Sequence, residues 1–107
     1  MIATAKEVLK DLQRLASPQK ARGLARFFKT GPGQYGEGDV FLGITVPAQR
    51  EVAKLYKDLP LAEIQKLLKS KTHEHRFTAL EILVMQYDAG NSAARKEIYN
   101  FYIRNTQ

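Results

Sequence analysis

The segment from residue 73 to residue 89 constrains the fold more than any other part of the sequence. Apolar side chains lie nearly all round a helix formed by it: Phe77, Ala79, Leu80, Ile82, Leu83, Val84 and Met85. A helix that is apolar on most sides is stable only when other elements cover it. We therefore expect a central, buried helix, with Thr72 as a cap at its start and Gly90 at its end.

Five further helices are predicted by apolar residues at helical spacing, separated by proline and glycine. The first spans about residues 2–16. The second begins at Ser17 and Pro18, a cap and a first-turn proline, and stops between residues 30 and 33. The third opens at Pro47, Pro60 separates it from a short fourth helix, and Asn91 or Ser92 caps the sixth.

Each of these helices has an apolar stripe that we expect to be buried. The first two stripes are Ile2, Ala5, Leu9, Leu12 and Leu15 or Ala16, and then Ala21, Leu24, Ala25 and Phe28. The third and fourth helices contribute Ala48, Val52, Leu55 and Tyr56, and then Leu61, Ile64, Leu67 and Leu68. The sixth contributes Ala94, Ile98, Phe101 and Tyr102. Strand alternation is weak and confined to residues 40–46.

The order of these helices indicates a single all-α domain. Three consecutive helix pairs with short connections predict antiparallel hairpins, stacked as a short solenoid (an α–α superhelix) or as an irregular bundle. A solenoid needs a polar end to close its core, yet Tyr99 and Ile103 lie beside the buried stripe of the last helix. Either this end packs on another copy, giving self-association, or residues 1–107 are the N-terminal fragment of a longer protein. We favour the fragment.

The charge distribution indicates a polyanionic partner. The net charge is +6, and residues 1–30 hold seven basic and two acidic groups. Such a field attracts polyanions to one part of the surface, although the same charge could serve solubility alone. The sequence has no cysteine, which excludes disulfides, thiolate catalysis and cysteine zinc sites. No apolar run is long enough to span a bilayer, so a cytoplasmic protein without membrane contact is expected.

No catalytic, metal or cofactor site is predicted. His73 and His75 are two residues apart and lie on different faces of a helix, unlike a metal pair at four-residue spacing. We assign His73 and Glu74 to the start of a helix. The glycine-rich residues 31–38 lack the Lys-Ser/Thr ending of a phosphate-binding loop, so we interpret them as a surface loop that could still touch a ligand.

The second helix differs from the others because one aromatic residue lies off its apolar stripe. At ~100° per residue, Phe27 points roughly 110° away from the centre of that stripe. Four basic residues lie on its flank or nearby: Lys20, Arg22, Arg26 and Lys29. An exposed aromatic among cations is typical of a nucleic-acid-binding surface; the alternative is that Phe27 packs against the following loop. A second basic set lies on the exposed side of the third helix: Arg50, Lys54 and Lys57.

Three segments resemble a known family. Residues 24–30 (LARFFKT), 41–50 (FLGITVPAQR) and 73–83 (HEHRFTALEIL) are similar to the N-terminal half of the DNA alkylation repair proteins. These are the AlkD-like glycosylases, built from HEAT-like helical repeats. The resemblance extends from about Leu12 to Tyr102, and the FLGI segment followed by Pro47 and Arg50 after a basic helix is its most specific part.

The resemblance implies a short HEAT-like solenoid whose concave basic surface holds duplex DNA by its phosphates. Such proteins excise N3- and N7-alkylated purines. The residues implied in contacts with phosphates are Arg26, Lys29, Arg50 and Lys54, while Phe27 and Thr45 would lie near the duplex. The family usually has tyrosine at the position of Phe27 and often glutamine at that of Thr45. A hydroxyl contact is therefore lost at Phe27, and the reach of Thr45 is shorter.

The catalytic residues of the family have no match in this sequence. They lie in a segment with tryptophan and aspartate just after the helix that matches residues 97–104, whereas this sequence ends at Gln107 and has no tryptophan. We therefore expect residues 1–107 to hold DNA without releasing a base. Two other functions remain open: a helical scaffold for acidic protein partners, and a non-catalytic binder of DNA or RNA structures.

Overall fold

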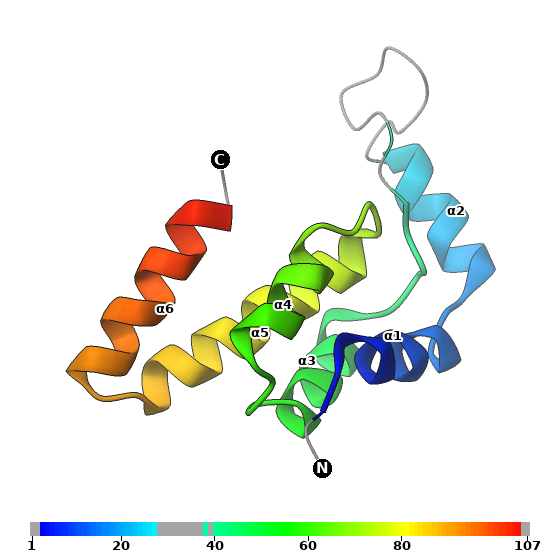
Figure 1. The fold of residues 1–107 in the computed structure, drawn as a ribbon. Coiled ribbons are helices and arrows are strands. Elements are labelled where there is room, and N and C mark those ends of the chain that lie inside the picture. Colours follow the sequence, from blue (N-terminus) through cyan, green and yellow to red (C-terminus); the bar gives the residue numbers. More distant parts are fainter. Residues whose placement is uncertain (1–2, 28–37, 39, 106–107) are drawn as a thin grey trace.

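The computed structural model describes residues 3–27, 38 and 40–105, and this part of the chain consists of helices joined by irregular segments (Figure 1). Its helices are α1 (Ala5–Arg14), α2 (Pro18–Phe27), α3 (Val46–Leu55), α4 (Leu61–Leu68), α5 (His73–Ala89) and α6 (Ser92–Asn105). No strand forms among the described residues, and the weak strand pattern of residues 40–46 gives one isolated bridge between Val40 and Thr72. The predicted all-α class is confirmed.

Most helix starts are capped by the residues that the sequence offers for it. Thr4 and Glu7 form a reciprocal capping box on α1, and the hydroxyl of Thr45 accepts the N–H of Ala48 on α3 (3.4 Å). Asn91 caps α6 as predicted, with its carbonyl oxygen 2.9 Å from the amide nitrogen of Ala94. Thr72 occupies the capping position of α5 but makes no side-chain bond. The N–H of its neighbour His73 instead donates to the carbonyl of Val40 at 2.8 Å.

The longest helix, α5, is the centre of the core, as its apolar sequence predicted. It packs against α1, α3, α4 and α6. Its buried Ala79 and Ile82 belong to the same core cluster as Leu12 of α1, Ile64 of α4 and Phe101 of α6. One side of α5 remains accessible at Leu80 and Val84, so the helix is central without being covered all round.

Three pairs of helices that are two apart in the chain pack on each other, as expected between stacked helical hairpins, whereas α2 and α4 do not within the described residues. The pairs are α1 with α3, α3 with α5, and α4 with α6, and α5 also contacts its chain neighbours α4 and α6. The predicted packing of α1 on α2 and of α3 on α4 is absent among the described residues. Both α3 and α4 bury their stripes on α5 instead, because α5 offers apolar surface on several sides.

Several apolar residues lie elsewhere than predicted. Leu15 is exposed because α1 ends at Arg14, and Val8 is buried beside Ala5 and Leu12. Leu55 is 75% exposed: the buried face of α3 runs through Gln49, Val52 and Ala53, and Leu55 points away from it. Tyr102 is exposed as well.

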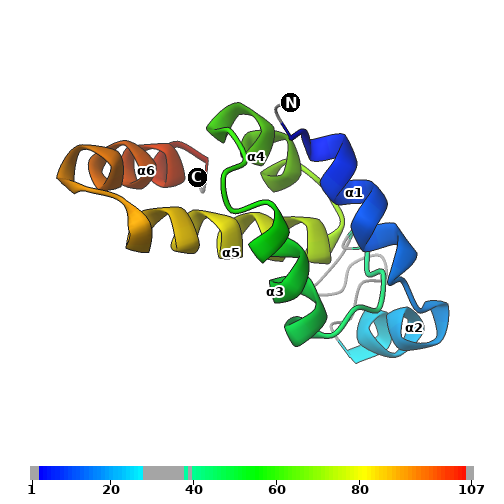
Figure 2. The same cartoon turned by 90° about the horizontal axis from the view of Figure 1, so that it is seen from below.

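Helix α2 lies apart from the rest of the molecule. None of its residues is fully buried, and among the described residues it packs on no other helix. The predicted stripe at Ala21, Leu24 and Ala25 is only half-buried, and Phe28 lies outside the described residues. The two views place α2 and α6 at opposite ends of the molecule (Figures 1 and 2). None of the described helices combines the length and the apolar character that a membrane span requires.

Candidate nucleic-acid interface

The start of α2 rests on an extended segment formed by residues 41–44. The N–H of Ser17 donates to the carbonyl of Leu42 at 2.7 Å, and the Ser17 hydroxyl accepts the N–H of Lys20 at 3.4 Å. Gly43 has a φ of +80°. A Cβ atom there would lie 2.2 Å from the carbonyl oxygen of Ser17 and 2.7 Å from the amide nitrogen of Ala21. Glycine is therefore required both by the backbone conformation and by the close approach of α2.

A buried carboxylate holds the same segment from its other side. Glu74, in the first turn of α5, is 1% exposed. Its Oε1 accepts the N–H of Leu42 (2.9 Å), and its Oε2 accepts the N–H groups of Gly43 (2.9 Å) and Ile44 (3.3 Å). These donors satisfy a charge that would otherwise be costly to bury.

The role of Glu74 was missed in the sequence, where it was assigned only to a helix start. A signal was present: an acidic residue in a helix that must be buried needs partners, and the irregular glycine-containing segment 41–44 has N–H groups without strand or helix partners. Two further contacts fix that segment. The side-chain amide of Gln49 donates to the carbonyl of Ile44 at 2.8 Å, and the rings of Phe41 and His73 lie 5.0 Å apart.

The cations Lys20, Arg22 and Arg26 of α2 are exposed. Among the described residues, no carboxylate lies within 4.0 Å of Lys20, Arg22 or Arg26. Phe27 is 76% exposed, as its position off the apolar stripe predicted. Lys29, the other cation predicted here, lies outside the described residues. The face of α2 thus presents positive charge and one aromatic ring to solvent.

Arg50 and Lys54 of α3 differ from the cations of α2 because both are paired, whereas Lys57, the third cation predicted here, follows the end of α3. The guanidinium of Arg50 lies 3.5 Å from the carboxylate of Glu81 on α5, and the ammonium of Lys54 lies 3.1 Å from Glu51. These side chains are largely exposed apart from that of Glu81. Exposed pairs of this kind contribute roughly 0–1 kcal/mol each, so a phosphate could displace either carboxylate at small cost.

A hollow of about 480 Å³ separates α2 from the start of α3. Its lining residues are Lys20, Gly23, Leu24, Gly43, Ile44, Thr45 and Val46. At helical spacing, Lys20, Gly23 and Phe27 share one face of α2. Thr45 therefore lines the same hollow as Lys20 and Gly23, which share a face of α2 with Phe27. Arg50 and Lys54 lie further along α3.

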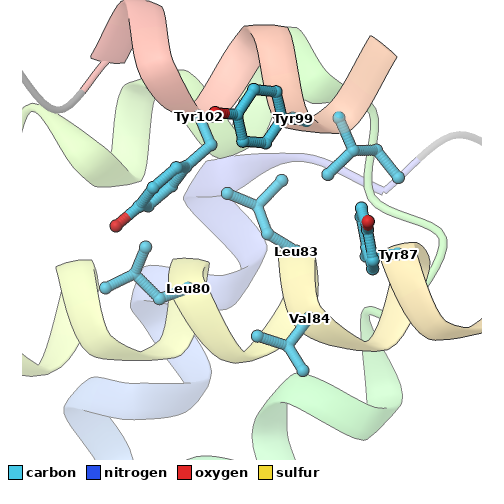
Figure 3. A pocket seen from close by; sticks show the side chains of 7 residues that line it. Leu80, Leu83, Val84, Tyr87, Tyr99 and Tyr102 are labelled. Carbon is cyan, nitrogen blue, oxygen red and sulfur yellow. The ribbon is translucent and has the colours of Figure 1, made fainter. Parts of the chain in front are cut away.

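A second hollow, of about 370 Å³, lies between α5 and α6 and has no charged lining residue (Figure 3). It is formed by Leu80, Leu83, Val84, Tyr87, Ile98, Tyr99 and Tyr102. Tyr99, which lines this hollow, and Ile103 are both exposed on α6, as the sequence indicated. The guanidinium of Arg95 lies over the ring of Tyr87, 5.2 Å from its centroid.

Comparisons with known proteins agree with the sequence resemblance. A family model described as DNA alkylation repair enzyme matches residues 8–107. No curated protein and no solved structure matched the chain. The family match covers all three segments that carry the resemblance, together with the Glu74 contacts that join two of them. The chain therefore belongs to the DNA alkylation repair family.

Proposed function

We propose that α2 and the first residues of α3 bind the sugar–phosphate backbone of duplex DNA, and that the chain thereby serves DNA alkylation repair. The observation that carries this proposal is the cationic face of α2. Arg26 and its neighbours have no carboxylate partner among the described residues, and they lie beside an exposed Phe27. A duplex neutralises such cations and releases its own counterions in return.

The predicted residues have three different roles in this proposal. Arg26, Lys29, Arg50 and Lys54 contact phosphates, which position the duplex. The ring of Phe27 offers apolar surface to sugars or bases, and Thr45 lies near the duplex at the start of α3. The hydroxyl of Thr45 accepts a bond from Ala48 and still has its own proton to donate.

The proposed partner is duplex DNA that carries alkylated purines, a choice supported by membership of the family. Phosphate contacts carry no information about the bases. Binding by these residues should therefore be nearly equal for methylated and unmodified duplexes, because none of them is assigned a role in recognising or excising the lesion.

The proposal is tested by fluorescence anisotropy with a short labelled duplex at several salt concentrations. With about four phosphate contacts, the slope of log affinity against log salt should be roughly −3 to −4. Replacing both Arg26 and Lys29 with alanine should make that slope shallower by about two units. Phe27→Ala should lower the affinity and leave the slope nearly unchanged, because an aromatic contact releases no counterion.

The matched control removes two cations from the opposite end of the molecule. Lys96 and Arg104 are exposed on α6, and replacing both with alanine changes the net charge by the same amount. Their loss should alter the slope far less than the loss of Arg26 and Lys29. Equal slopes for the two double variants would show only general attraction by net charge, and the proposed interface would be wrong. Preference for an acidic protein over DNA would favour a scaffold instead.

A further inference from the structure

The position of α2 depends on the segment 41–44. Within the described residues α2 packs on no other helix, and its first turn lies against Leu42 and Gly43. The other helices bury apolar side chains in a shared core, whereas α2 has no fully buried residue. The orientation of α2 relative to α3 and α5 is therefore set mainly by whatever fixes this segment.

Glu74 fixes the segment on the side that faces away from α2. Its two oxygens accept three consecutive backbone N–H groups, from Leu42 to Ile44. Gly43 contacts both partners: its N–H donates to Glu74, and its Cα lies against Ser17 and Ala21 at the start of α2. A chain of contacts thus joins α5 to α2 through one glycine.

We propose that Glu74 is a positioning residue of the nucleic-acid interface. By holding the N–H groups of residues 42–44, it sets the orientation of α2, and with it the places of Arg26 and Phe27 relative to Thr45. The consequence for DNA rests on the proposed function, but the effect on the orientation of α2 does not.

Glutamine is the informative replacement for Glu74. It has nearly the same shape, but one of its two terminal groups is an NH₂ donor, which would face backbone N–H donors and accept nothing. Glu74→Gln therefore removes at least one of the three bonds and leaves a donor opposite a donor. Segment 41–44 should loosen, and α2 should take a wider range of orientations.

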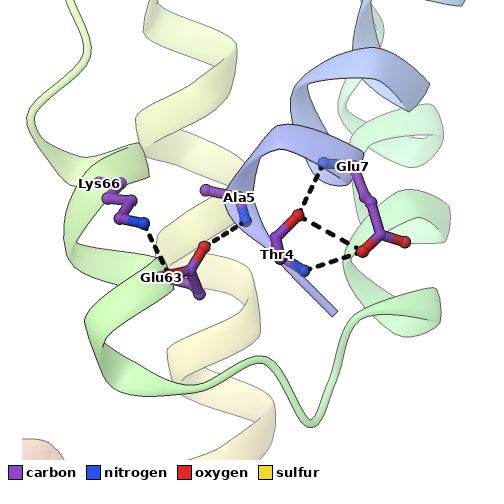
Figure 4. A network of polar contacts seen from close by, with 5 residues as sticks. All are labelled: Thr4, Ala5, Glu7, Glu63 and Lys66. Carbon is purple, nitrogen blue, oxygen red and sulfur yellow. Dashed lines mark hydrogen bonds and ion pairs between the residues drawn. The ribbon is translucent and has the colours of Figure 1, made fainter. Parts of the chain in front are cut away.

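A second carboxylate provides a matched control. Glu63 of α4 accepts the N–H of Ala5 at the start of α1 (2.9 Å) and pairs with Lys66 at 2.8 Å (Figure 4). Glu63→Gln makes the same chemical change at another helix start. Helix α1, however, packs against α3, α4 and α5 and buries Val8 and Leu12, so it should keep its place.

The orientation of α2 can be measured directly because the chain has no cysteine. Spin labels on Arg22→Cys and Asp88→Cys report the distance from α2 to α5, and labels on Gln13→Cys and Asp88→Cys report that from α1 to α5. Glu74→Gln should broaden or shift the first distance distribution and leave the second unchanged. Glu63→Gln should change neither. An unchanged α2–α5 distribution in a folded Glu74→Gln variant would overturn the proposal.

Gly43→Ala tests the same proposal if the loss of Glu74 prevents folding. The added methyl would meet backbone atoms of Ser17 and Ala21, while Glu74 keeps its charge. The α2–α5 distance should change as in Glu74→Gln, with the α1–α5 distance preserved. If α2 stays in place in Gly43→Ala, the contact through Gly43 does not determine its orientation.

The last measurement connects orientation to DNA. Glu74→Gln should weaken duplex binding roughly tenfold, the size expected when one or two charged contacts are lost. Arg26→Ala should then reduce the duplex affinity less in the Glu74→Gln background than in the parent, because a displaced Arg26 already contributes little to binding. If the effects of the two substitutions on duplex affinity are additive, Glu74 does not position Arg26 in the interface. If the parent itself does not bind DNA, the proposed function fails, and the distance measurements still decide the role of Glu74.

Discussion

Helices α2 and α6 lie at opposite ends of the molecule, and both expose aromatic side chains, but they are attached in different ways. Helix α6 buries Ile98 and Phe101 in the shared core. Helix α2 buries no residue fully and is held by backbone contacts to residues 42 and 43. One end is attached by apolar packing and the other by hydrogen bonds and a close backbone approach.

The surroundings of the exposed aromatics differ in the same way. Cations without described acidic partners lie near Phe27, which suits a polyanion. Tyr99 and Tyr102 line a hollow without charge, which suits an apolar partner (Figure 3). An exposed aromatic is therefore informative only together with its neighbours, and the two ends of this chain should bind different kinds of partner.

The largest expected difference between the ends is in stability. Phe101→Ala should lower the free energy of unfolding by about 3–5 kcal/mol, because it leaves a cavity in the core. Phe27→Ala, at a side chain that is 76% exposed, should change that free energy by less than about 0.5 kcal/mol. Urea denaturation followed by circular dichroism measures both. Similar losses for the two variants would mean that α2 is part of the core.

The second prediction concerns the uncharged end. We propose that the α5–α6 hollow allows the isolated chain to self-associate at high concentration, with little dependence on salt. Changing Tyr99 and Ile103 to serine should weaken this association about tenfold, since apolar area near the hollow is removed. Light scattering across a concentration series measures it, with Phe27→Ser as the control at the other end. A parent chain that stays monomeric at millimolar concentration contradicts the prediction.

A smaller effect is expected where side chains join α1 to α3. The hydroxyl of Tyr56 donates to the carboxylate of Asp11, and burial, followed by this bond, raises the pKa of Tyr56 to about 12. Tyr56→Phe should lower the free energy of unfolding by about 1 kcal/mol, because the pair is partly exposed.

The same bond should depend on pH in a definite direction. A tyrosine with a raised pKa stabilises the fold fully below its ordinary pKa of 10, and that contribution is lost as the pH rises from 10 towards 12. The difference between the parent and Tyr56→Phe should therefore shrink over this range in denaturation experiments. If the difference in free energy of unfolding stays constant up to pH 12, the hydrogen bond from the Tyr56 hydroxyl to Asp11 does not stabilise the fold.

The smallest effect is expected at the paired cations of α3. Glu81→Gln frees Arg50 from its ion pair, so duplex affinity should rise by up to about threefold. Asp88→Asn removes the same charge from the same helix, at a carboxylate that pairs with no cation among the described residues, and should raise the affinity less. Equal increases would assign the effect to net charge rather than to Arg50.

Much of the fold was predictable because α5 carries apolar residues on nearly every side. That pattern predicted the central position of α5, and proline, glycine and capping residues predicted where most helices begin. Periodicity alone misplaced Leu55 and Tyr102, since the face that is buried depends on which neighbour covers it. Leu55 points away from the buried face of α3, and Tyr102 lines the open hollow between α5 and α6, which leaves it accessible.

The candidate site was predictable only in part. The exposure of Phe27 followed from its angle to the stripe of α2, and the cationic character of α2 followed from its composition. The ion pair of Arg50 did not, because Glu81 is distant in the chain from it. Lys54 pairs with Glu51 at the local i,i+3 spacing, and that pair was not predicted. Glu74 was missed for the same reason as the pair of Arg50: its backbone partners lie 30 to 32 residues away, and no local pattern shows a contact of that span.

The difference between the two ends is tested most directly by following backbone amide signals during a titration with a short duplex. We predict that ¹H–¹⁵N correlation spectra will show the largest shifts in α2 and in residues 41–50, with salt-dependent affinity, and little change along α6. Shifts concentrated around Tyr99 and Tyr102, or spread evenly over all exposed cations, would contradict the assignment of DNA binding to α2 and the start of α3.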